Sequence, residues 1–254
     1  MDRRVDVSLV MPAYNEGFCI EKAIGRVDQA AEKLGLNYEL IIVDDGSRDD
    51  TRLKAIKYAN GNHHVQIVSY DLNMGKGYAL KTGVDHAKGE AVILMDSDLD
   101  IDASQINRYI NALKHGDMVI ASKRNPKSIF NASSERKVLS LSFNVLVRLI
   151  TGLKVSDTQS GLKAFRSGSI RKLMRFLTVK RFAFDVEVLT VAELMKLKIV
   201  ELPVKINLRG SFSVRQVFRM MIDLAGIGYR LRIKRWYQSN MNNDEPKYKP
   251  IIKW

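Results

Sequence analysis

The chain has 254 residues, which allows one large domain or two small ones. Lys and Arg number 41 against 28 Asp and Glu, a formal net charge of +13, so we expect an anionic partner: nucleic acid, an anionic membrane surface or a phosphorylated substrate. The single cysteine, Cys19, excludes an intrachain disulfide and a clustered-thiolate metal site, and it favours a reducing compartment.

The sequence predicts no membrane-spanning segment. The N-terminus lacks the apolar region of a signal peptide, and no apolar run reaches the roughly 18 to 20 residues that a spanning helix needs. The longest candidate, 138–153, is too short and contains Arg148. We therefore expect a soluble or peripheral protein, on the cytoplasmic face if it lies on a membrane.

Short apolar runs alternate with helical patterns over the first half of the chain. Strands are expected at 5–10, 38–45, 65–71, 91–96 and 117–122, and helices at 16–34, 48–60, 75–87 and 103–116. This order predicts an α/β fold with a mostly parallel, Rossmann-like sheet and helices on both faces. In such sheets, ligands bind beyond the carboxyl ends of the strands.

The alternation is less regular after residue 125. A helix is expected at 135–150, a strand at 199–208 and an amphipathic helix at 214–236. We divide the chain into a domain at 1–210 with halves 1–125 and 126–210, a basic helix at 211–237, and a polar tail at 238–254, which we expect to be mobile.

Carboxylates gather at the end of the fourth expected strand, at Asp96, Asp98, Asp100 and Asp102. Like charges this close repel one another, and Mg²⁺ or Mn²⁺ would cancel the repulsion and bind phosphate oxygens on its other side. Asp96 and Asp98 are the best-placed ligands. Asp102 precedes an expected helix and is better explained as an N-cap. The alternative for the whole stretch is a solvated acidic turn.

Two further polar motifs follow strands. VDDGS contains Asp44 and Asp45, which either form a turn or recognise a base N–H or a ribose hydroxyl. NMGKG places Lys76 and backbone amides at a helix start, which favours a diphosphate. It is not a P-loop, because the first glycine and the Ser/Thr of that motif are missing. No G-x-G-x-x-G follows the first strand, which argues against a Rossmann NAD site.

The order PAYNE, VDDGS, NMGKG, DSD resembles the family 2 glycosyltransferases. Later stretches resemble the branch that makes polyprenyl-phosphate hexoses, which includes dolichyl-phosphate glucose and mannose synthases. These stretches are ASKRNP (121–126), RKVLS (136–140), VSDTQSGLKAF (155–165), FDVE (184–187) and ELPVKINLR (201–209). The SDTQSG and FDVE wording is closer to the glucose synthases, and the resemblance covers about residues 5–210.

The resemblance implies a GT-A fold and inverting transfer of a hexose from UDP-glucose or GDP-mannose to a polyprenyl (dolichyl) phosphate, giving a β-linked product. The half 1–125 would bind the nucleotide sugar and the half 126–210 the acceptor. The residues expected at the nucleotide sugar are Pro12, Tyr14, Glu16, Asp44, Asp45, Lys76 and Asp96, and those expected at the Mg²⁺ or Mn²⁺ are Asp96, Asp98 and Asp100.

A lipid phosphate is already ionised near neutral pH, so its attack needs cations rather than a carboxylate base. The candidates are Lys123, Arg124, Arg136 and Arg209, which together with Asp98 are the expected catalytic residues. Their alternative role is solvated surface charge. Relatives often carry GSR where this chain has ASKR, which leaves open whether Lys123 or Arg124 contacts the phosphate.

The helix expected at 214–236 has one apolar face surrounded by Arg and Lys, and Trp236 and Tyr237 follow it. The face consists of Val214, Val217, Phe218, Met221, Leu224, Ala225, Gly228 and Leu231. The helix either lies on a membrane surface, together with 138–153, or packs on the protein's own sheet or a second subunit.

Two other functions fit parts of the sequence. A family 2 transferase with a saccharide acceptor would share the early motifs, although the QxxRW of processive polysaccharide synthases is missing. A basic nucleic-acid-binding module would fit the net charge, but it would show aromatic residues among the basic ones and would leave the acidic motifs unexplained. We therefore expect no nucleic acid. The oligomeric state, the sugar and the nucleotide stay open.

Overall fold

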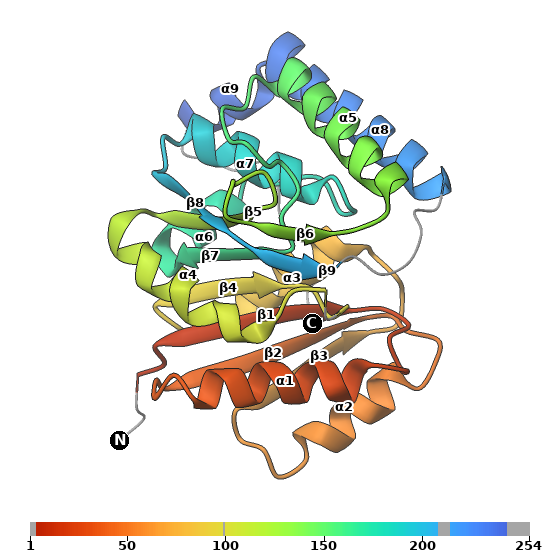
Figure 1. Ribbon diagram of the computed structural model, residues 1–254, viewed down its shortest axis with the longest axis vertical. Helices are drawn as coiled ribbons and strands as arrows, with labels where there is room; N and C mark the ends of the chain where they lie inside the picture. Colours follow the sequence, from red (N-terminus) through yellow and green to blue (C-terminus); the bar gives the residue numbers. More distant parts are fainter. Residues whose placement is uncertain (1–3, 99, 208–213, 243–254) are drawn as a thin grey trace.

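The protein is built on a seven-stranded, mostly parallel sheet with helices on both faces (Figure 1). The computed structural model describes residues 4–98, 100–207 and 214–242. The strand order is β3-β2-β1-β4-β7-β5-β8, and β7 pairs antiparallel with both neighbours. The strands are β1 (Val7–Ala13), β2 (Tyr38–Asp45), β3 (Val65–Tyr70), β4 (Ala91–Met95), β5 (Met118–Ser122), β7 (Leu162–Arg166) and β8 (Ile199–Pro203). The predicted α/β class is confirmed.

The central strands are buried on both faces because their apolar residues run without a break. Val10 and Ile41 contribute to one core, whereas Leu9 and Leu40 contribute to the other. Side chains of a strand alternate between faces, so a strand covered by helices on both sides reads as continuously hydrophobic. This burial fixes the register that brings the carboxyl ends of β1, β2 and β4 to one edge.

Helices cover the two faces in separate groups. On one face lie α1 (Ile20–Glu32), α2 (Thr51–Ala59) and α4 (Ile106–Ala112), the last flanked by the 3₁₀ turns η1 (Ala103–Gln105) and η2 (Leu113–His115). On the other lie α3 (Lys76–His86), α6 (Ser167–Met174) and α7 (Phe184–Leu194). The loops at the carboxyl ends of the strands therefore open between two helical layers.

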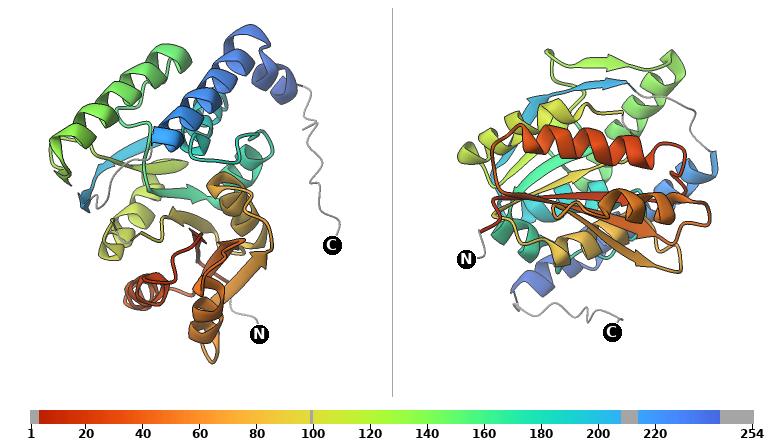
Figure 2. Two further views of the ribbon diagram at one scale, coloured as in Figure 1. Left: turned by 90° about the vertical axis from the view of Figure 1, so that its right-hand side faces the viewer. Right: turned by 90° about the horizontal axis from the view of Figure 1, so that it is seen from below.

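Two further helices lie side by side beyond α7, at the end of the molecule remote from α1 and α2 (Figures 1 and 2). They are α5 (Ser134–Thr151) and α8 (Val214–Gly228). Phe143 and Val147 of α5 pack in the same core as Leu224 and Ile227 of α8. A small two-stranded sheet, β6 (Ile129–Asn131) with β9 (Lys205–Asn207), precedes the start of α5.

The second half of the chain differs from its predicted elements. The strand expected at 199–208 divides at Val204 between two sheets, because β8 pairs with β5 and β9 pairs with β6. Strand β7, from the second half, lies between β4 and β5 of the first, so the two halves share one sheet. The elements β6, β7, α6 and α7 were not predicted.

The expected C-terminal helix ends earlier than its pattern indicated. After α8 come a π-helical turn, η3 (Tyr229–Ile233), and a short helix, α9 (Trp236–Asn242). Arg235 has a φ of 47°, which breaks the helix between them. Residues 238–242, assigned to a mobile tail, are thus helical, and Asn240 is buried; the rest of that tail lies outside the described residues.

Among the helices within residues 4–98, 100–207 and 214–242, none combines the length and the hydropathy that crossing a membrane requires.

Candidate active site

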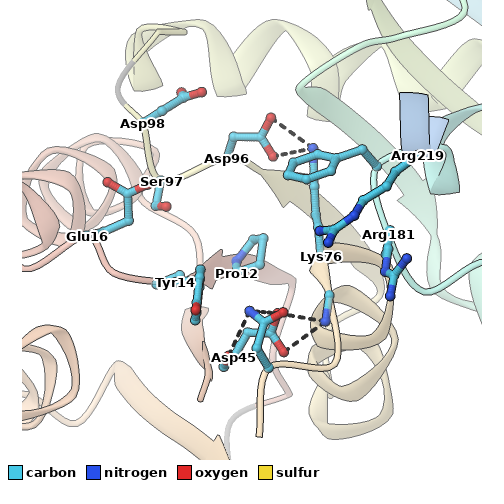
Figure 3. Close-up of a pocket in the computed structure, with 14 residues that line it drawn as sticks. Pro12, Tyr14, Glu16, Asp45, Lys76, Asp96, Ser97, Asp98, Arg181 and Arg219 are labelled. Atoms are coloured by element: carbon cyan, nitrogen blue, oxygen red, sulfur yellow. Dashed lines mark hydrogen bonds and ion pairs between the residues drawn. The ribbon is translucent and has the colours of Figure 1, made fainter. Parts of the chain in front are cut away.

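A cavity of about 460 Å³ opens at the carboxyl ends of β1, β2 and β4 (Figure 3). Its volume is in the range of about 300 to 1,000 Å³ that is typical of small-molecule sites. The lining residues are Pro12, Ala13, Tyr14, Glu16, Asp45, Asn73, Gly75, Lys76, Asp96, Ser97, Asp98, Arg181, Phe182 and Arg219. The structure therefore brings together side chains from the motifs PAYNE, VDDGS, NMGKG and DSD.

Asp45 lies on the cavity floor and holds the loop that leads into α3. Its carboxylate accepts hydrogen bonds from the Tyr70 hydroxyl (2.7 Å) and from the backbone N–H groups of Met74 and Gly75 (both 2.8 Å). Burial raises the pKa of Asp45, and these bonds oppose the rise. Asp45 is thus a structural acceptor as well as a lining residue.

Asp44 does not line the cavity. It is 2% exposed, and its carboxylate accepts a hydrogen bond from the Ser47 N–H at 3.3 Å, which forms the turn after β2. Gly46 has a φ of 67° in that turn, and a Cβ there would lie 2.6 Å from the Leu72 carbonyl carbon. The two interpretations of VDDGS thus apply to different residues: Asp44 forms the turn, and Asp45 lines the cavity.

The backbone amides at the start of α3 are already bonded within the protein. Gly77 and Tyr78 donate to the Lys180 carbonyl at 2.8 and 3.2 Å, and Gly75 donates to Asp45. The amides expected near a diphosphate thus have acceptors within the protein, because the segment 178–182 lies against the helix end. The glycines admit that segment: a Cβ at Gly75 would lie 2.4 Å from the Lys180 carbonyl oxygen.

Lys76 belongs to a row of alternating charges beneath the cavity. Its Nζ lies 2.7 Å from Asp96 Oδ1 and 3.6 Å from Asp185 Oδ2, and Lys163 Nζ lies 2.6 Å from Asp185 Oδ1. Lys163 is 2% exposed and Asp185 is 6% exposed. Burial opposes the charge on Asp185, but Lys163 and Lys76 outweigh it and hold the pKa of Asp185 below its usual value. Lys163 of the SGLKAF stretch and Asp185 of FDVE thus hold Lys76 of NMGKG in place.

Asp98 differs from Asp96 because it lies open to the cavity. Asp96 is paired with Lys76, whereas Asp98 accepts a hydrogen bond from the Asp100 N–H at 3.0 Å and forms no ion pair with a described residue. The surrounding protein and the neighbouring Asp96 raise the pKa of Asp98 to about 7. Because the carboxyl of Asp98 is partly shielded from water and lies near the negative charge of Asp96, a cation would be favoured at this position.

The three carboxylates expected at a metal do not form one group. Asp100 is 7% exposed, lies off the cavity, and accepts a backbone hydrogen bond from Asn207 at 3.0 Å through its carbonyl. Within the residues described, no three His, Cys, Asp or Glu side chains gather as a metal-binding set. Asp102 is an N-cap, as predicted, because its carboxylate accepts the Ser104 N–H at 2.9 Å.

The described cations among those expected at the acceptor, Lys123, Arg124 and Arg136, lie outside the cavity lining. Lys123 is nearly buried, and its Nζ pairs with Asp157 Oδ2 at 3.0 Å and donates to the Gln159 carbonyl. Arg124 donates to the Ser140 hydroxyl on α5 at 3.2 Å. Arg136 lies one helical turn before Ser140, so both face the same side of α5. Arg209 lies outside the described residues.

A second wall of the cavity was not predicted from the sequence. Arg181 and Phe182 come from the loop before α7, and Arg219 comes from α8 (Figure 3). We call these three residues the helical wall, and we call Pro12, Asp45, Lys76 and Asp96 the strand-end wall. Arg181 lies three residues before Phe184, the first residue of the FDVE stretch, which was a usable signal. Arg219 had none, because nothing local distinguishes it from the other arginines between 215 and 235.

The sheet topology and the cavity at its carboxyl edge agree with a glycosyltransferase of the GT-A type. The family described as "Glycosyl transferase family 2" matches residues 8–174, and the chain belongs to that family. Among solved structures, glucosyl-3-phosphoglycerate synthase from Mycobacterium tuberculosis, in complex with Mn²⁺, UDP-glucose and phosphoglyceric acid, is similar with a TM-score of 0.67 at 20% identity, covering 89% of this chain and 79% of that one.

Curated relatives are similar over most of the chain. A dolichyl-phosphate beta-glucosyltransferase (ALG5D) of Trichomonas vaginalis is 29% identical, covering 92% of this chain and 76% of its own length. The human dolichyl-phosphate beta-glucosyltransferase is 31% identical, covering 78% and 66%. The dodecaprenyl-phosphate galacturonate synthase of Rhizobium johnstonii is 28% identical, covering 91% and 68%.

Proposed function

We propose that this protein transfers a hexose from a nucleotide sugar to a polyprenyl phosphate, with inversion at the anomeric carbon. Two observations together support the proposal. The chain belongs to family 2 and has a cavity to which Asp98 is open, and its relatives carry a polyprenyl phosphate in their names. The sugars in those names differ, glucose in one and galacturonate in another, whereas the lipid phosphate is common to both. The acceptor class is thus better supported than the sugar.

The donor set of the cavity fits a divalent cation. Asp96 and Asp98 supply carboxylate oxygens, and Mg²⁺ and Mn²⁺ prefer such ligands and commonly take one or two of them together with substrate phosphates. A solved relative of the fold was crystallised with Mn²⁺ and UDP-glucose. We propose Asp98, with Asp96, as the holder of Mg²⁺ or Mn²⁺, which when bound offsets charge on the diphosphate. Asp100 is left out of this set because it is buried away from the cavity.

The reaction needs no general base. An oxygen of the lipid phosphate attacks the anomeric carbon, the bond from that carbon to the diphosphate breaks, and the electron pair leaves with the nucleoside diphosphate. Lys76, held in place by Asp96 and Asp185, faces the developing negative charge. Tyr14 and Pro12 lie at the other side of the cavity, where a planar base would pack against the exposed Tyr14 ring (Figure 3).

We place the acceptor phosphate near Arg124 and Arg136 rather than Lys123. Lys123 is neutralised by Asp157 at 3.0 Å, so it has a structural partner. Arg124 has a buried Nε with no hydrogen-bond partner among the described residues, and a phosphate oxygen would satisfy it. Ser140, which Arg124 contacts, lies one turn from Arg136 on the same helix.

We also propose that α5 and α8 dock on the membrane that holds the lipid, on its cytoplasmic face. Four apolar side chains of α5 recur at three- and four-residue spacing and are 48 to 74% exposed: Val138, Leu141, Val145 and Leu149. On the neighbouring α8, Phe218 is 66% exposed and Ile222 is 57% exposed. Monomeric proteins rarely expose a contiguous apolar area of this kind without a partner, and a polyprenyl chain lies in a bilayer.

The amphipathic face predicted for the C-terminal helix is divided between these roles. Leu224 and Leu231 are buried in the protein's own core, whereas Phe218 and Met221 are exposed. Both interpretations of that face therefore have residues that support them. Nearby arginines and lysines would each add roughly 1 kcal/mol to binding at an anionic surface.

The transfer reaction is tested by following the label. The purified protein is incubated with radiolabelled UDP-glucose or GDP-mannose, dolichyl phosphate and Mn²⁺, and the organic phase is counted. We expect label to enter with one donor, and about 100- to 1,000-fold more slowly with Asp98→Asn. If neither donor nor a panel of other nucleotide sugars labels the lipid, the proposed function is wrong.

Docking is tested by flotation with vesicles of phosphatidylcholine and phosphatidylglycerol. We expect the wild type to co-float, and Val145→Asp and Leu149→Asp to reduce co-flotation. Leu53→Asp is the matched control, because Leu53 is 72% exposed on α2, at the opposite end of the molecule. Equal loss in the control and in the α5 variants would contradict a specific docking face.

A further inference from the structure

Helix α8 presents a third face, directed at the donor cavity. Its core face includes Met220, Leu224 and Ile227, and its exposed apolar face includes Phe218 and Ile222. The remaining side carries Arg219, Asp223 and Gly226 at four- and three-residue spacing, and Arg230 continues this side in the π-helical turn η3. Arg219 lines the donor cavity, and the other three line an adjacent cavity together with Lys180, Arg181 and the edge of the apolar face at Ile222.

Arg219 and Arg181 are, beside Lys76, the cationic residues of the cavity lining. The lining includes four carboxylates, at Glu16, Asp45, Asp96 and Asp98. Lys76 is already paired with Asp96 and Asp185. Arg219 and Arg181 form no ion pair with a described residue, and Figure 3 shows both on the same side of the cavity as Lys76. A diphosphate entering this cavity would meet these two guanidinium groups, which bind phosphate oxygens well.

The loop that carries Arg181 is tied to the C-terminal helices through one buried carboxylate. Glu187 is fully buried and accepts hydrogen bonds from the backbone N–H groups of Thr178 and Val179, at 2.8 and 2.7 Å. It also accepts from the Tyr237 hydroxyl at 2.5 Å, and Arg230 lies 3.5 Å away. The position of the loop and that of the segment following α8 are therefore linked mechanically.

We propose that Arg219, with Arg181, binds the diphosphate of the nucleotide sugar, and that α8 thereby couples membrane docking to donor binding. Contact of Phe218 and Ile222 with lipid holds α8 in the position that places Arg219 in the cavity. This inference rests on the proposed function, to which it adds a residue and a surface dependence. By linkage, a membrane that favours this position must raise donor affinity, and bound donor must raise membrane affinity equally.

The coupling is measured by calorimetric titration of UDP-glucose and GDP-mannose, with Mn²⁺ and without acceptor, in the presence and absence of vesicles of equal parts phosphatidylcholine and phosphatidylglycerol. For the wild type we expect one donor to bind at least about fivefold more tightly with vesicles. Arg219→Gln should weaken binding by about tenfold, the loss of one charge-assisted contact, and abolish the vesicle effect while vesicle flotation persists. Arg219→Lys, which keeps the charge, should recover part of the affinity.

Two further variants separate the parts of the proposal. Phe218→Ser should lower flotation and the vesicle effect but leave vesicle-free donor affinity unchanged. Lys57→Gln removes an exposed positive charge on α2, at the opposite end of the molecule, and should change neither flotation nor donor affinity. Each variant is checked for an unchanged thermal unfolding midpoint, so that misfolding is not mistaken for a binding loss.

The outcomes distinguish this inference from the function on which it rests. If the wild type binds a donor and Arg219→Gln binds it equally well, the assignment of Arg219 is overturned and the transferase stands. If vesicles leave wild-type donor affinity unchanged, the coupling is overturned. If the wild type binds no nucleotide sugar at all, both proposals fail.

Discussion

The two walls of the cavity are held in place to very different degrees. In the strand-end wall, Asp45 is 3% exposed and saturated with hydrogen bonds, and Lys76 and Asp96 are joined to the buried Asp185–Lys163 pair. In the helical wall, Phe182 is 44% exposed and Arg181 and Arg219 are exposed. One wall is part of the folded core, and the other is carried by a loop and by a helix with an uncovered apolar face.

The difference suggests a division of labour between the walls. Rigid, buried elements fix the groups that must not move during the reaction, whereas segments with few buried contacts are the ones that rearrange on binding. Substitutions in the strand-end wall should therefore cost stability as well as activity. Substitutions in the helical wall should cost binding alone, and the predictions below test that contrast.

The largest effect is expected for Asp185→Asn. It leaves Lys163, which is 2% exposed, without its ionised partner, and breaking a buried pair in this way costs about 3 to 5 kcal/mol. Urea denaturation would show this as a lower free energy of unfolding. The double variant with Lys163→Met should recover much of the loss, and a loss below about 1 kcal/mol in the single variant would contradict the buried row of charges.

Asp98→Asn should lower activity without lowering stability, although Asp98 follows a core strand, because its side chain is exposed. We expect its kcat to fall by about 100- to 1,000-fold, as for loss of a preorganised electrostatic group. The free energy of unfolding should not fall at neutral pH, because the pKa of Asp98 is raised to about 7 and the folded state gains little from its charge. If the variant unfolded more easily than the wild type, Asp98 would contribute to stability, as we expect of the residues in the strand-end wall.

Asp185, which pairs with Lys76 of the strand-end wall, should also make the stability of the protein depend on pH in the acid range. The pKa of Asp185 is lowered in the folded state, so its contribution is present above the unfolded pKa of about 4 and is lost as the pH falls through the folded pKa. One such group changes the free energy of unfolding by at most about 1.4 kcal/mol per pH unit. Unfolding curves from pH 5 to pH 2 should be less steep in pH for Asp185→Asn, and an identical profile would contradict this assignment.

The smallest change in stability is expected for Phe182→Ala in the helical wall. A half-exposed side chain away from the core typically changes the free energy of unfolding by less than about 0.5 kcal/mol. The KM for the nucleotide sugar should rise nonetheless, because Phe182 lines the cavity. Thermal denaturation and steady-state kinetics on one preparation would test both, and a large loss of stability would remove the contrast between the walls.

The same contrast explains which parts of the site the sequence could predict. The strand-end residues follow apolar strands directly, so local pattern and parallel-sheet geometry place Tyr14, Asp45 and Asp96 at one edge. The four missed elements include β7, whose antiparallel insertion between β4 and β5 depends on contacts far apart in the chain. Arg219 could not be found for the same reason, since nothing local distinguishes it from the other arginines of its segment.

Local patterns also cannot show partners that are distant in the chain. The α3 amides look available in NMGKG, but the Lys180 carbonyl, about a hundred residues later, occupies them. Lys123 looks like a phosphate contact in ASKR, but Asp157 neutralises it. Sequence motifs identified the right neighbourhood in both cases, whereas the hydrogen-bond partners needed the folded structure.

The most direct test of the account concerns the chemistry of the acceptor. Purified protein is given labelled nucleotide sugar with Mn²⁺ and one of two lipids, a polyprenyl phosphate or the corresponding polyprenol without phosphate. The account predicts label in the organic phase only with the phosphate, because a phosphate oxygen is already ionised whereas a neutral hydroxyl would first have to lose a proton, and because the buried Nε of Arg124 lacks a hydrogen-bond partner among the described residues. Equal transfer to the polyprenol, or transfer only to a saccharide, would contradict it.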